Sequence, residues 1–363
     1  MRRHKNKTTF SVEFTGFLDA DGRTTCELPA FAVDARNLLP LYRAMVLTRT
    51  FDEKAVALQR TGRLGTYASS LGQEAVAIGV ASAMRPEDVL LPSFREQGAQ
   101  IWRGVALKEA LLYWGGDERG SAFKEQKEDF PVCVPVGTQF PHAAGVAAAF
   151  QSRNEKRVAV AVGGDGATSK GDFYEALNVA GAWKLPAVFI INNNQWAISV
   201  PRSAQTAAET LAQKAIAAGM PGAQVDGNDV IAVRDAASRA IERARDGGGP
   251  SLVEAVSYRL SDHTTADDAR RYRDEKEVSA HWKEDPVARL RTYLVSQNAW
   301  SKSDEETLIG ECVQAVGAAV DEYLSAGVAN VGDIFDYLYA RCPPDLAHQR
   351  DEAVAFARES DDG

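Results

Sequence analysis

Two short apolar runs, residues 158–162 (VAVAV) and 187–191 (AVFII), constrain the fold of this chain most strongly. Both are rich in apolar residues and lack alternation with polar ones, which is typical of strands buried on both faces of a parallel sheet. The helical pattern of residues 170–185 lies between them and has the length of one crossover connection. The two runs therefore predict neighbouring parallel strands joined by a helix.

Further strands are expected at the start of residues 87–98 and in residues 251–259. Helices are expected in residues 38–62, 70–84, 105–116, 137–157, 170–185, 208–219 and 229–249. This alternation predicts the α/β class, with a doubly wound parallel sheet and helices on both faces. We expect a mobile N-terminal arm in residues 1–37, an α/β domain in residues 38–280, and a helical C-terminal segment of the same domain in residues 281–363.

Composition excludes several classes of partner. The 363 residues include 41 basic and 50 acidic side chains, a formal net charge of −9, so the chain lacks the basic footprint of a nucleic-acid-binding protein. It has no apolar run of about 18 residues, and the basic start MRRHKNKTTF has no apolar core behind it, so neither a membrane span nor a secretory signal is expected. The four cysteines do not have metal-site or dithiol spacing. These features favour a cytoplasmic location.

Polar residues follow both strands of the first pair. Asp165 lies between Gly164 and Gly166 at the end of one strand. Asn194 is the last of three consecutive asparagines that follow the next strand. Ligands of open α/β sheets bind at the carboxyl ends of strands, where these side chains would meet. Carboxylate and amide oxygens are ligands that Mg²⁺ prefers, with phosphate oxygens filling its other positions. The pair therefore predicts a magnesium-held phosphate group, with glycines that let the backbone approach it closely.

Neither half of the pattern is specific alone. A GDG sequence after a strand is often only a turn, and consecutive asparagines often cap or terminate elements. Two other phosphate loops fail on the sequence: GGDGATSKGD lacks the G-x-x-x-x-G-K-[ST] pattern, and G-x-G-x-x-G fails at Ser169. The missing first pattern disfavours a P-loop nucleotide hydrolase, and a diphosphate held through a metal ion remains.

The segment GGDGATSKGDFYEALNVAGAWKLPAVFIINNNQWAIS resembles the thiamine-diphosphate motif. More narrowly, it is similar to the alpha subunit of the decarboxylase component of 2-oxo acid dehydrogenases, of pyruvate, branched-chain or acetoin type. Further blocks are similar to this family in the same order: RTGRLGTYASSLGQEAVAIG, LLPSFREQGAQIWRG, VPVGTQFPHAAGVA, PGAQVDGNDVIAV and YRLSDHTTADDARRYRDEKE. The resemblance covers about residues 38–345 and implies the thiamine-diphosphate-binding α/β fold.

The resemblance implies metal ligands at Asp165, Asn194 and the main-chain carbonyl of Trp196. A Tyr-Arg pair holds the diphosphate in the family, and here it reads Phe94-Arg95, so the arginine is present and the hydroxyl donor is absent. The guanidinium offers a planar fork suited to phosphate oxygens. In some members an arginine precedes the asparagine pair, and this chain has Asn192 there.

Other expected contacts come from the same resemblance. His263 matches a loop histidine that contacts the diphosphate region and assists acyl transfer, so it is the expected catalytic residue. Val136 matches the apolar residue that holds the cofactor in its bent shape. Gly164, Gly166 and Ala167 belong to the diphosphate motif, and Arg259, at the end of the last strand, is expected to reach the same pocket.

The resemblance implies oxidative decarboxylation of pyruvate with acyl transfer to a lipoyl carrier, and a branched-chain 2-oxo acid is the alternative substrate. The cofactors would be thiamine diphosphate and magnesium. The family's cofactor-activating glutamate lies on a separate beta subunit, so we expect an alpha2 beta2 heterotetramer that serves a lipoyl-bearing acyltransferase. The departures at Phe94 and Asn192 leave one further alternative, a non-catalytic subunit that binds magnesium and diphosphate.

Overall fold

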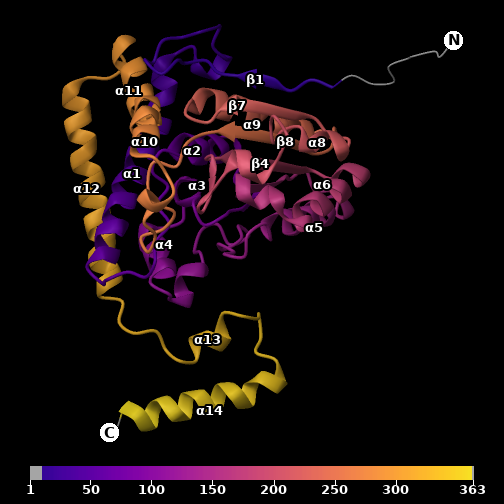
Figure 1. The fold of residues 1–363 in the computed structure, drawn as a ribbon. Coiled ribbons are helices and arrows are strands. Elements are labelled where there is room, and N and C mark those ends of the chain that lie inside the picture. The colour runs from indigo at the N-terminus through magenta and orange to yellow at the C-terminus, as the bar shows by residue number, and fades with distance from the viewer. Residues whose placement is uncertain (1–9, 362–363) are drawn as a thin grey trace, which may run out of the picture.

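The computed structural model describes residues 10–361 and contains a six-stranded, all-parallel sheet in the order β1-β7-β8-β4-β3-β2 (Figure 1). Its strands are β1 (Glu13–Thr15), β2 (Val89–Leu91), β3 (Ala159–Gly164), β4 (Ala187–Asn193), β7 (Gly222–Asp226) and β8 (Ser251–Val256). A short antiparallel ribbon of β5 (Trp196–Ala197) and β6 (Val200–Pro201) follows β4. The predicted α/β class is confirmed.

The predicted pairing of the two apolar strands is also confirmed, because β3 and β4 are adjacent and parallel. Their side chains alternate between two hydrophobic cores, one on each face of the sheet. Val160 and Val162 enter the first core, whereas Ala159 and Ala161 enter the second. Burial on both faces explains why these strands are continuous apolar runs in the sequence.

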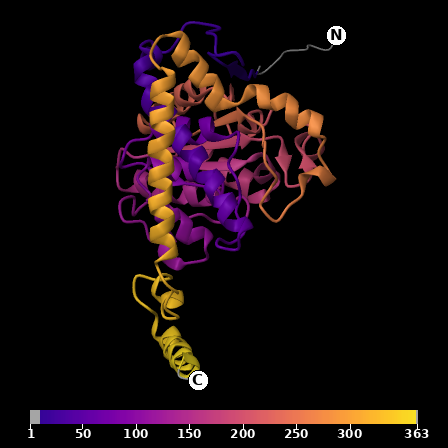
Figure 2. The ribbon, with the colours of Figure 1, turned by 90° about the vertical axis from the view of Figure 1, so that its left-hand side faces the viewer.

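Helices cover both faces of the sheet. In Figure 1, α12 and α1 lie to the left of the sheet, and α5 and α6 lie to its lower right. The first core is built with α1 (Leu39–Arg60), α2 (Glu74–Ala83), α9 (Val230–Arg245), α11 (Pro286–Ser296) and α12 (Lys302–Leu324). The second is built with α5 (Gln139–Ser152), α6 (Gly171–Trp183) and α8 (Lys214–Ala217). Figure 2 shows the long α12 running down the side of the body.

The other helices are shorter or lie at the ends of the molecule. They are α3 (Gln97–Trp102), α4 (Leu107–Trp114), α7 (Arg202–Gln205), α10 (Glu275–His281), α13 (Asp333–Asp336) and α14 (Pro344–Asp361). The 3-10 turns are η1 (Ala30–Ala32), η2 (Ala35–Leu38), η3 (Glu118–Ser121), η4 (Asp165–Ser169), η5 (Ala269–Arg271) and η6 (Trp282–Glu284). Among the residues that the structure describes, no helix is both long and apolar enough to cross a membrane.

A mobile arm was expected in residues 1–37, but the described part of this segment is packed against the domain. Its residues 1–9 lie outside the described residues. From Glu13 the chain forms β1 at the edge of the sheet, and Phe17 and Leu18 are buried. Their backbone amides donate to Asp229 Oδ2 at 2.7 and 2.9 Å. This three-residue strand gives no periodic signal, because its place depends on contacts made more than 200 residues away.

The prediction of a helix in residues 208–219 is largely wrong, because only α8 (Lys214–Ala217) is helical within that range. The amide of Ala212 donates to Glu254 Oε2 at 3.0 Å, on the buried strand β8. Gly181 of α6 packs closely against this segment, because a Cβ there would lie 2.1 Å from the carbonyl oxygen of Ala218. Tertiary contacts thus override the local helical preference. The strand β7, which was not expected, follows directly.

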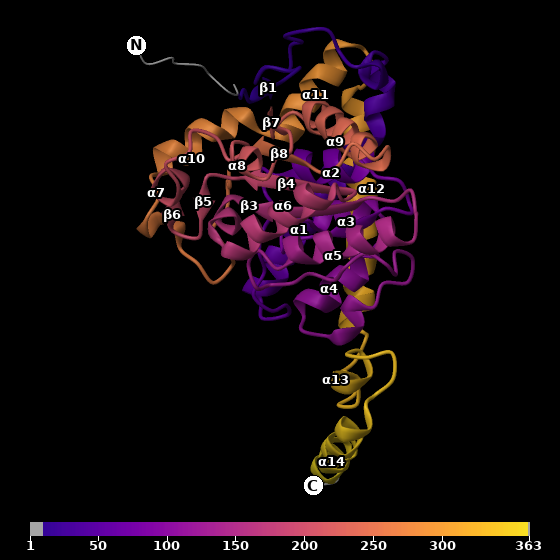
Figure 3. The ribbon, with the colours of Figure 1, turned by 90° about the vertical axis from the view of Figure 1, so that its right-hand side faces the viewer.

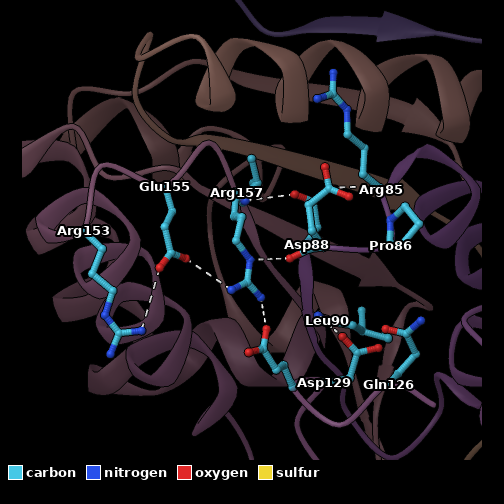
Figure 4. A network of polar contacts seen from close by, with 12 residues as sticks. Arg85, Pro86, Asp88, Leu90, Gln126, Asp129, Arg153, Glu155 and Arg157 are labelled. Carbon is cyan, nitrogen blue, oxygen red and sulfur yellow. Dashed lines mark hydrogen bonds and ion pairs between the residues drawn. The ribbon is translucent and has the colours of Figure 1, made fainter.

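A buried ionic network stabilises the amino-terminal ends of β2 and β3 (Figure 4). Asp88 accepts hydrogen bonds from the amides of Arg85 and Val158 at 2.8 and 2.9 Å and pairs with Arg245 of α9. Asp129 similarly accepts from the Leu90 amide at 2.8 Å. These acids lie at the amino edge of the sheet, so the network supports the strands without contributing to the carboxyl edge.

The predicted C-terminal segment is helical. The division expected after residue 280 falls within α10, and α11 packs Leu290 and Leu294 into the first core. Beyond α12 the chain leaves the body, and α13 and α14 project from it in all three views (Figures 1–3). Arg350 of α14 pairs with Asp336 of α13 through two contacts of 2.9 Å.

Candidate functional site

A cavity of about 230 Å³ opens at the carboxyl ends of β3 and β4. Its lining contains predicted site residues from several segments, namely Phe94, Arg95, Val136, Gly164, Asp165, Gly166, Ala167, Asn194, Trp196 and His263. Arg259 is fully buried beside this lining and bonds to the Trp196 carbonyl oxygen and to His263. The structure thus brings all of the predicted site residues together.

Asp165 is the first residue of η4, directly after β3, and is only 2% exposed. Burial raises the pKa of this carboxyl group above its ordinary value. Gln205 Nε2 donates to its Oδ2 at 2.8 Å, and the Thr168 hydroxyl donates to its main-chain oxygen at 2.8 Å. The buried Lys214 in turn donates to the Thr168 carbonyl and hydroxyl oxygens. These hydrogen bonds hold the η4 turn in place, with the Asp165 carboxylate at the cavity wall.

Asn194 and Trp196 stand on a strained loop after β4. Two residues of this loop, Gln195 and Ile198, have positive φ values of 72° and 55°. For the β-branched Ile198 this conformation is costly and persists only where neighbours hold it. Arg259 donates to the Ile198 carbonyl oxygen at 2.8 Å, while the Trp196 amide donates to Asn194 Oδ1 at 3.3 Å. These bonds keep the two predicted metal ligands beside the cavity.

Two buried guanidinium groups give the site positive charge. Arg95 and Arg259 are 5% and 0% exposed, and neither forms an ion pair with a carboxylate among residues 10–361. Arg95 donates to the carbonyl oxygens of Ser69 and His263, and Arg259 to that of Ile198. Burial and the nearby charge of Arg259 lower the pKa of Arg95 to about 10, so Arg95 stays charged at neutral pH. Burial also lowers the pKa of Arg259. Buried charges of this kind require a counterion, and an anionic ligand would supply it.

The ring of His263 is held by both arginines. Its Nδ1 lies 3.0 Å from Arg95 NH2 and 3.3 Å from Arg259 NH1, and its amide donates to Asp267 Oδ2 at 2.9 Å. A guanidinium can only donate, so Nδ1 is the acceptor and the neutral ring carries its proton on Nε2. Burial and the two positive charges lower the pKa of His263 to about 4. The ring is therefore neutral at physiological pH and faces Phe94 edge-on at 5.9 Å.

This low pKa makes the ligand-free chain sensitive to acid. In the unfolded chain His263 takes up a proton near pH 6.5, whereas in the folded chain it does so only near pH 4. The free energy of unfolding should therefore fall as the pH drops from about 6.5 to about 4. The variant His263→Asn should flatten this dependence in denaturant titrations at several pH values. The prediction fails if the variant and the natural chain lose stability in parallel over that window.

Residues of the cavity lining also carry buried polar atoms without a partner among the described residues. Gln73 Nε2, Gln139 Oε1 and Trp196 Nε1 have no hydrogen-bond partner in the described part of the chain. No group of three or more His, Cys, Asp or Glu residues suited to a metal occurs among the described residues. The oxygen donors of Asp165, Asn194 and Trp196 provide only one charged ligand, which suits a magnesium ion that takes its remaining ligands from phosphate and water. The residues present therefore fit a magnesium diphosphate group.

Two residues of this site, Gln73 and Gln205, were not predicted from the sequence. Gln73 lies in the block SLGQEA and Gln205 in the segment after β6, yet neither carries a pattern that separates it from an ordinary polar residue. Gly166 was expected to admit a phosphate. In the structure it also admits the neighbouring loop, because a Cβ there would lie 2.7 Å from the Cβ of Ala197. Gln73 precedes α2, and only the folded chain places it at the strand ends.

The sequence was also compared with protein-family models and with curated proteins, and both comparisons give matches over most of the chain. Residues 42–331 match the family model described as dehydrogenase E1 component. The chain is 40% identical to the pyruvate dehydrogenase E1 component subunit alpha of Staphylococcus epidermidis over 345 residues, which cover 95% of this chain and 93% of that protein. It is 44% identical to the 3-methyl-2-oxobutanoate dehydrogenase subunit alpha of Mycobacterium tuberculosis over 321 residues, 88% of each chain.

Proposed function

The chain belongs to the dehydrogenase E1 component family, and on that premise we propose that it is the alpha subunit of a 2-oxo acid dehydrogenase decarboxylase component. The reaction is the oxidative decarboxylation of a 2-oxo acid with transfer of the acyl group to a lipoyl carrier. Pyruvate is the substrate that we propose first, and 3-methyl-2-oxobutanoate is the alternative, because relatives of both names match most of the chain.

One observation carries the proposal. Arg95 and Arg259 are buried at one cavity without a carboxylate ion pair among residues 10–361, and the oxygen donors of Asp165 and Asn194 lie at the same place. A magnesium diphosphate is an anion with a hard cation attached, so it complements both sets of groups at once. The family uses thiamine diphosphate, and the residues fit its diphosphate end.

In this proposal the chain's own residues bind and orient. Magnesium would be held by Asp165, Asn194 and the Trp196 carbonyl. Arg95 would neutralise the charge of the diphosphate oxygens, and Arg259 would lie beside the Trp196 carbonyl. Gly164, Gly166 and Ala167 would let the main chain approach the diphosphate. Thiamine diphosphate, when bound, would supply the carbon nucleophile and the electron sink for decarboxylation.

Two cavity residues would act farther from the metal. Val136 is 47% exposed at the cavity wall and offers an apolar surface on which the cofactor's rings could rest. His263 is neutral with its proton on Nε2, so it can donate a hydrogen bond toward a reacting group without adding charge. It is the residue that we propose as catalytic. Phe94 contributes no hydroxyl donor to the diphosphate, so Arg95 bears more of that binding.

The proposed partners are a beta subunit, in an alpha2 beta2 heterotetramer, and a lipoyl-bearing acyltransferase. The beta subunit would supply the glutamate that activates the cofactor. Support for this division of labour is that Asp165 and Glu96, the acids in the lining, are both committed: Asp165 lies among the expected metal ligands, and Glu96 accepts a hydrogen bond from Ser93. We expect the isolated chain to be inactive for this reason.

The test is dye-coupled decarboxylation by the chain co-expressed with its beta subunit. Pyruvate and 3-methyl-2-oxobutanoate are compared, each with and without thiamine diphosphate and Mg²⁺. Turnover that requires both cofactors supports the proposal, and the preferred acid identifies the substrate. Robust turnover by the alpha chain alone contradicts the proposed division of labour. A stable complex that binds cofactor yet turns over neither acid favours a non-catalytic magnesium-diphosphate subunit.

A further inference from the structure

Gln73 is part of the lining of the cavity. It precedes the first residue of α2 and is only 1% exposed. Its Oε1 accepts two hydrogen bonds, from Asn192 Nδ2 at 3.1 Å and from Asn194 Nδ2 at 3.0 Å. One glutamine oxygen therefore joins α2 to the end of β4, where the proposed metal ligand Asn194 stands.

These bonds fix the orientation of the Asn194 amide. Because Nδ2 of Asn194 is committed to Gln73, the amide cannot rotate to exchange its nitrogen and oxygen without losing that bond. Its Oδ1 accepts the Trp196 amide at 3.3 Å and has a second lone pair that can bind a cation. Asn192 is held in the same way, since the Ser257 hydroxyl donates to its Oδ1 at 2.7 Å while its Nδ2 donates to Gln73.

The other end of the Gln73 side chain is unsatisfied. Its Nε2 is buried and has no hydrogen-bond partner in the described part of the chain, although the residue lines the cavity. Leaving a buried donor without an acceptor is costly, and a ligand oxygen would remove that cost. An anionic oxygen would do so with a charge-assisted hydrogen bond.

We propose that Gln73 is a binding residue with two roles: its Oε1 positions Asn194 for the metal ion, and its Nε2 donates to a phosphate oxygen of the bound diphosphate. The inference rests on the proposed function, because it needs a magnesium diphosphate in this cavity. It adds the residue that precedes α2 to a site otherwise built from the segments around β3, β4 and His263.

A second glutamine provides a matched control. Gln97 of α3 is also buried, at 2% exposed, and also has one unpaired amide atom, its Oε1. Its Nε2 donates to the carbonyl oxygens of Ala68 and Phe94, and it is not part of the cavity lining. A purely structural loss should therefore be similar for the two glutamines, whereas an effect on ligand binding should follow Gln73.

The experiment uses the full chain assembled with its beta subunit and compares Gln73→Met, Gln73→Glu and Gln97→Met with the natural complex. Calorimetric titration gives the dissociation constant for thiamine diphosphate at saturating Mg²⁺. Intrinsic tryptophan fluorescence at saturating thiamine diphosphate gives the Mg²⁺ concentration for half-saturation. Thermal unfolding without ligands reports the structural cost of each substitution.

The two substitutions at Gln73 separate its roles. Gln73→Met removes the acceptor and the donor, so both cofactor and Mg²⁺ binding should weaken by about tenfold or more. Gln73→Glu keeps an acceptor for both asparagines but loses the donor, so Mg²⁺ half-saturation should stay within about threefold while cofactor binding weakens about tenfold or more. Gln97→Met should lower the unfolding temperature and leave both binding constants within about twofold.

The outcomes distinguish the inference from the proposed function. If the natural complex binds no thiamine diphosphate, the proposed function fails. If it binds and either Gln73 variant binds the cofactor as tightly as the natural complex, the donor role of Gln73 is overturned. If Gln97→Met weakens binding as much as Gln73→Met, the effect is structural and the inference is overturned as well.

Discussion

Replacing Asp165 with asparagine is expected to abolish cofactor-dependent turnover while stabilising the ligand-free chain at neutral pH. The substitution removes the one charged ligand of the proposed metal site, so activity and Mg²⁺ affinity should each fall by at least about two orders of magnitude. The side chain keeps its size, and an amide oxygen can still accept from Gln205 Nε2, which lies 2.8 Å from the carboxylate.

The gain in stability follows from the direction of the pKa shift. Burial raises the pKa of Asp165 in the folded chain above its ordinary value of 3.8, so ionisation of the group costs folding free energy as the pH rises past 3.8. A neutral amide does not pass through this ionisation. Asp165→Asn should therefore unfold at a higher temperature than the natural chain at pH 7, and the difference should disappear near pH 3.

The control for this prediction is Asp172→Asn. Asp172 lies in the first turn of α6, seven positions beyond Asp165, and is not part of the cavity lining. The control removes one negative charge close by and should leave Mg²⁺ affinity unchanged. Retention of full activity by Asp165→Asn would contradict the metal-ligand role, and a lower unfolding temperature at pH 7 would contradict the account of its burial.

Replacing Gly166 with alanine is expected to weaken cofactor binding by about tenfold to one-hundredfold. The added Cβ would lie 2.7 Å from the Cβ of Ala197, a distance that forces the two loops apart. Ala197 follows Trp196, whose carbonyl is a proposed metal ligand, so the displacement should move that oxygen away from Asp165. Overpacking of this kind costs about 1–3 kcal/mol of folding free energy.

A compensating substitution tests this steric explanation. The double variant Gly166→Ala with Ala197→Gly removes the opposing methyl group, and the next nearest atoms to the new Cβ lie at 3.5 and 3.8 Å, which are ordinary contacts. It should recover most of the lost cofactor affinity in calorimetric titration. If the double variant binds as poorly as Gly166→Ala alone, then Gly166 acts through its own approach to the diphosphate and the clash with Ala197 is not the cause.

Local patterns predicted the part of the site that comes from neighbouring strands. Asp165 and Asn194 follow β3 and β4, and the crossover between them made their proximity predictable from spacing alone. Arg95, Val136 and His263 lie on loops without such spacing, and only the resemblance to a family selected them. Gln73 and Gln205 were missed because a polar residue at a helix start or in a short helix has many ordinary roles.

By itself the sequence determined the fold class, the pairing of β3 with β4 and the acid at the end of β3, because these follow from hydrophobic periodicity and chain order. Tertiary structure decided the rest. The edge strand β1 and the short α8 depend on contacts with Asp229 and Glu254, which lie far away in the chain. The neutral state of His263 likewise depends on its own burial and on the charges of the two arginines beside it, because desolvation and Coulomb interactions depend on distances that exist only in the folded chain.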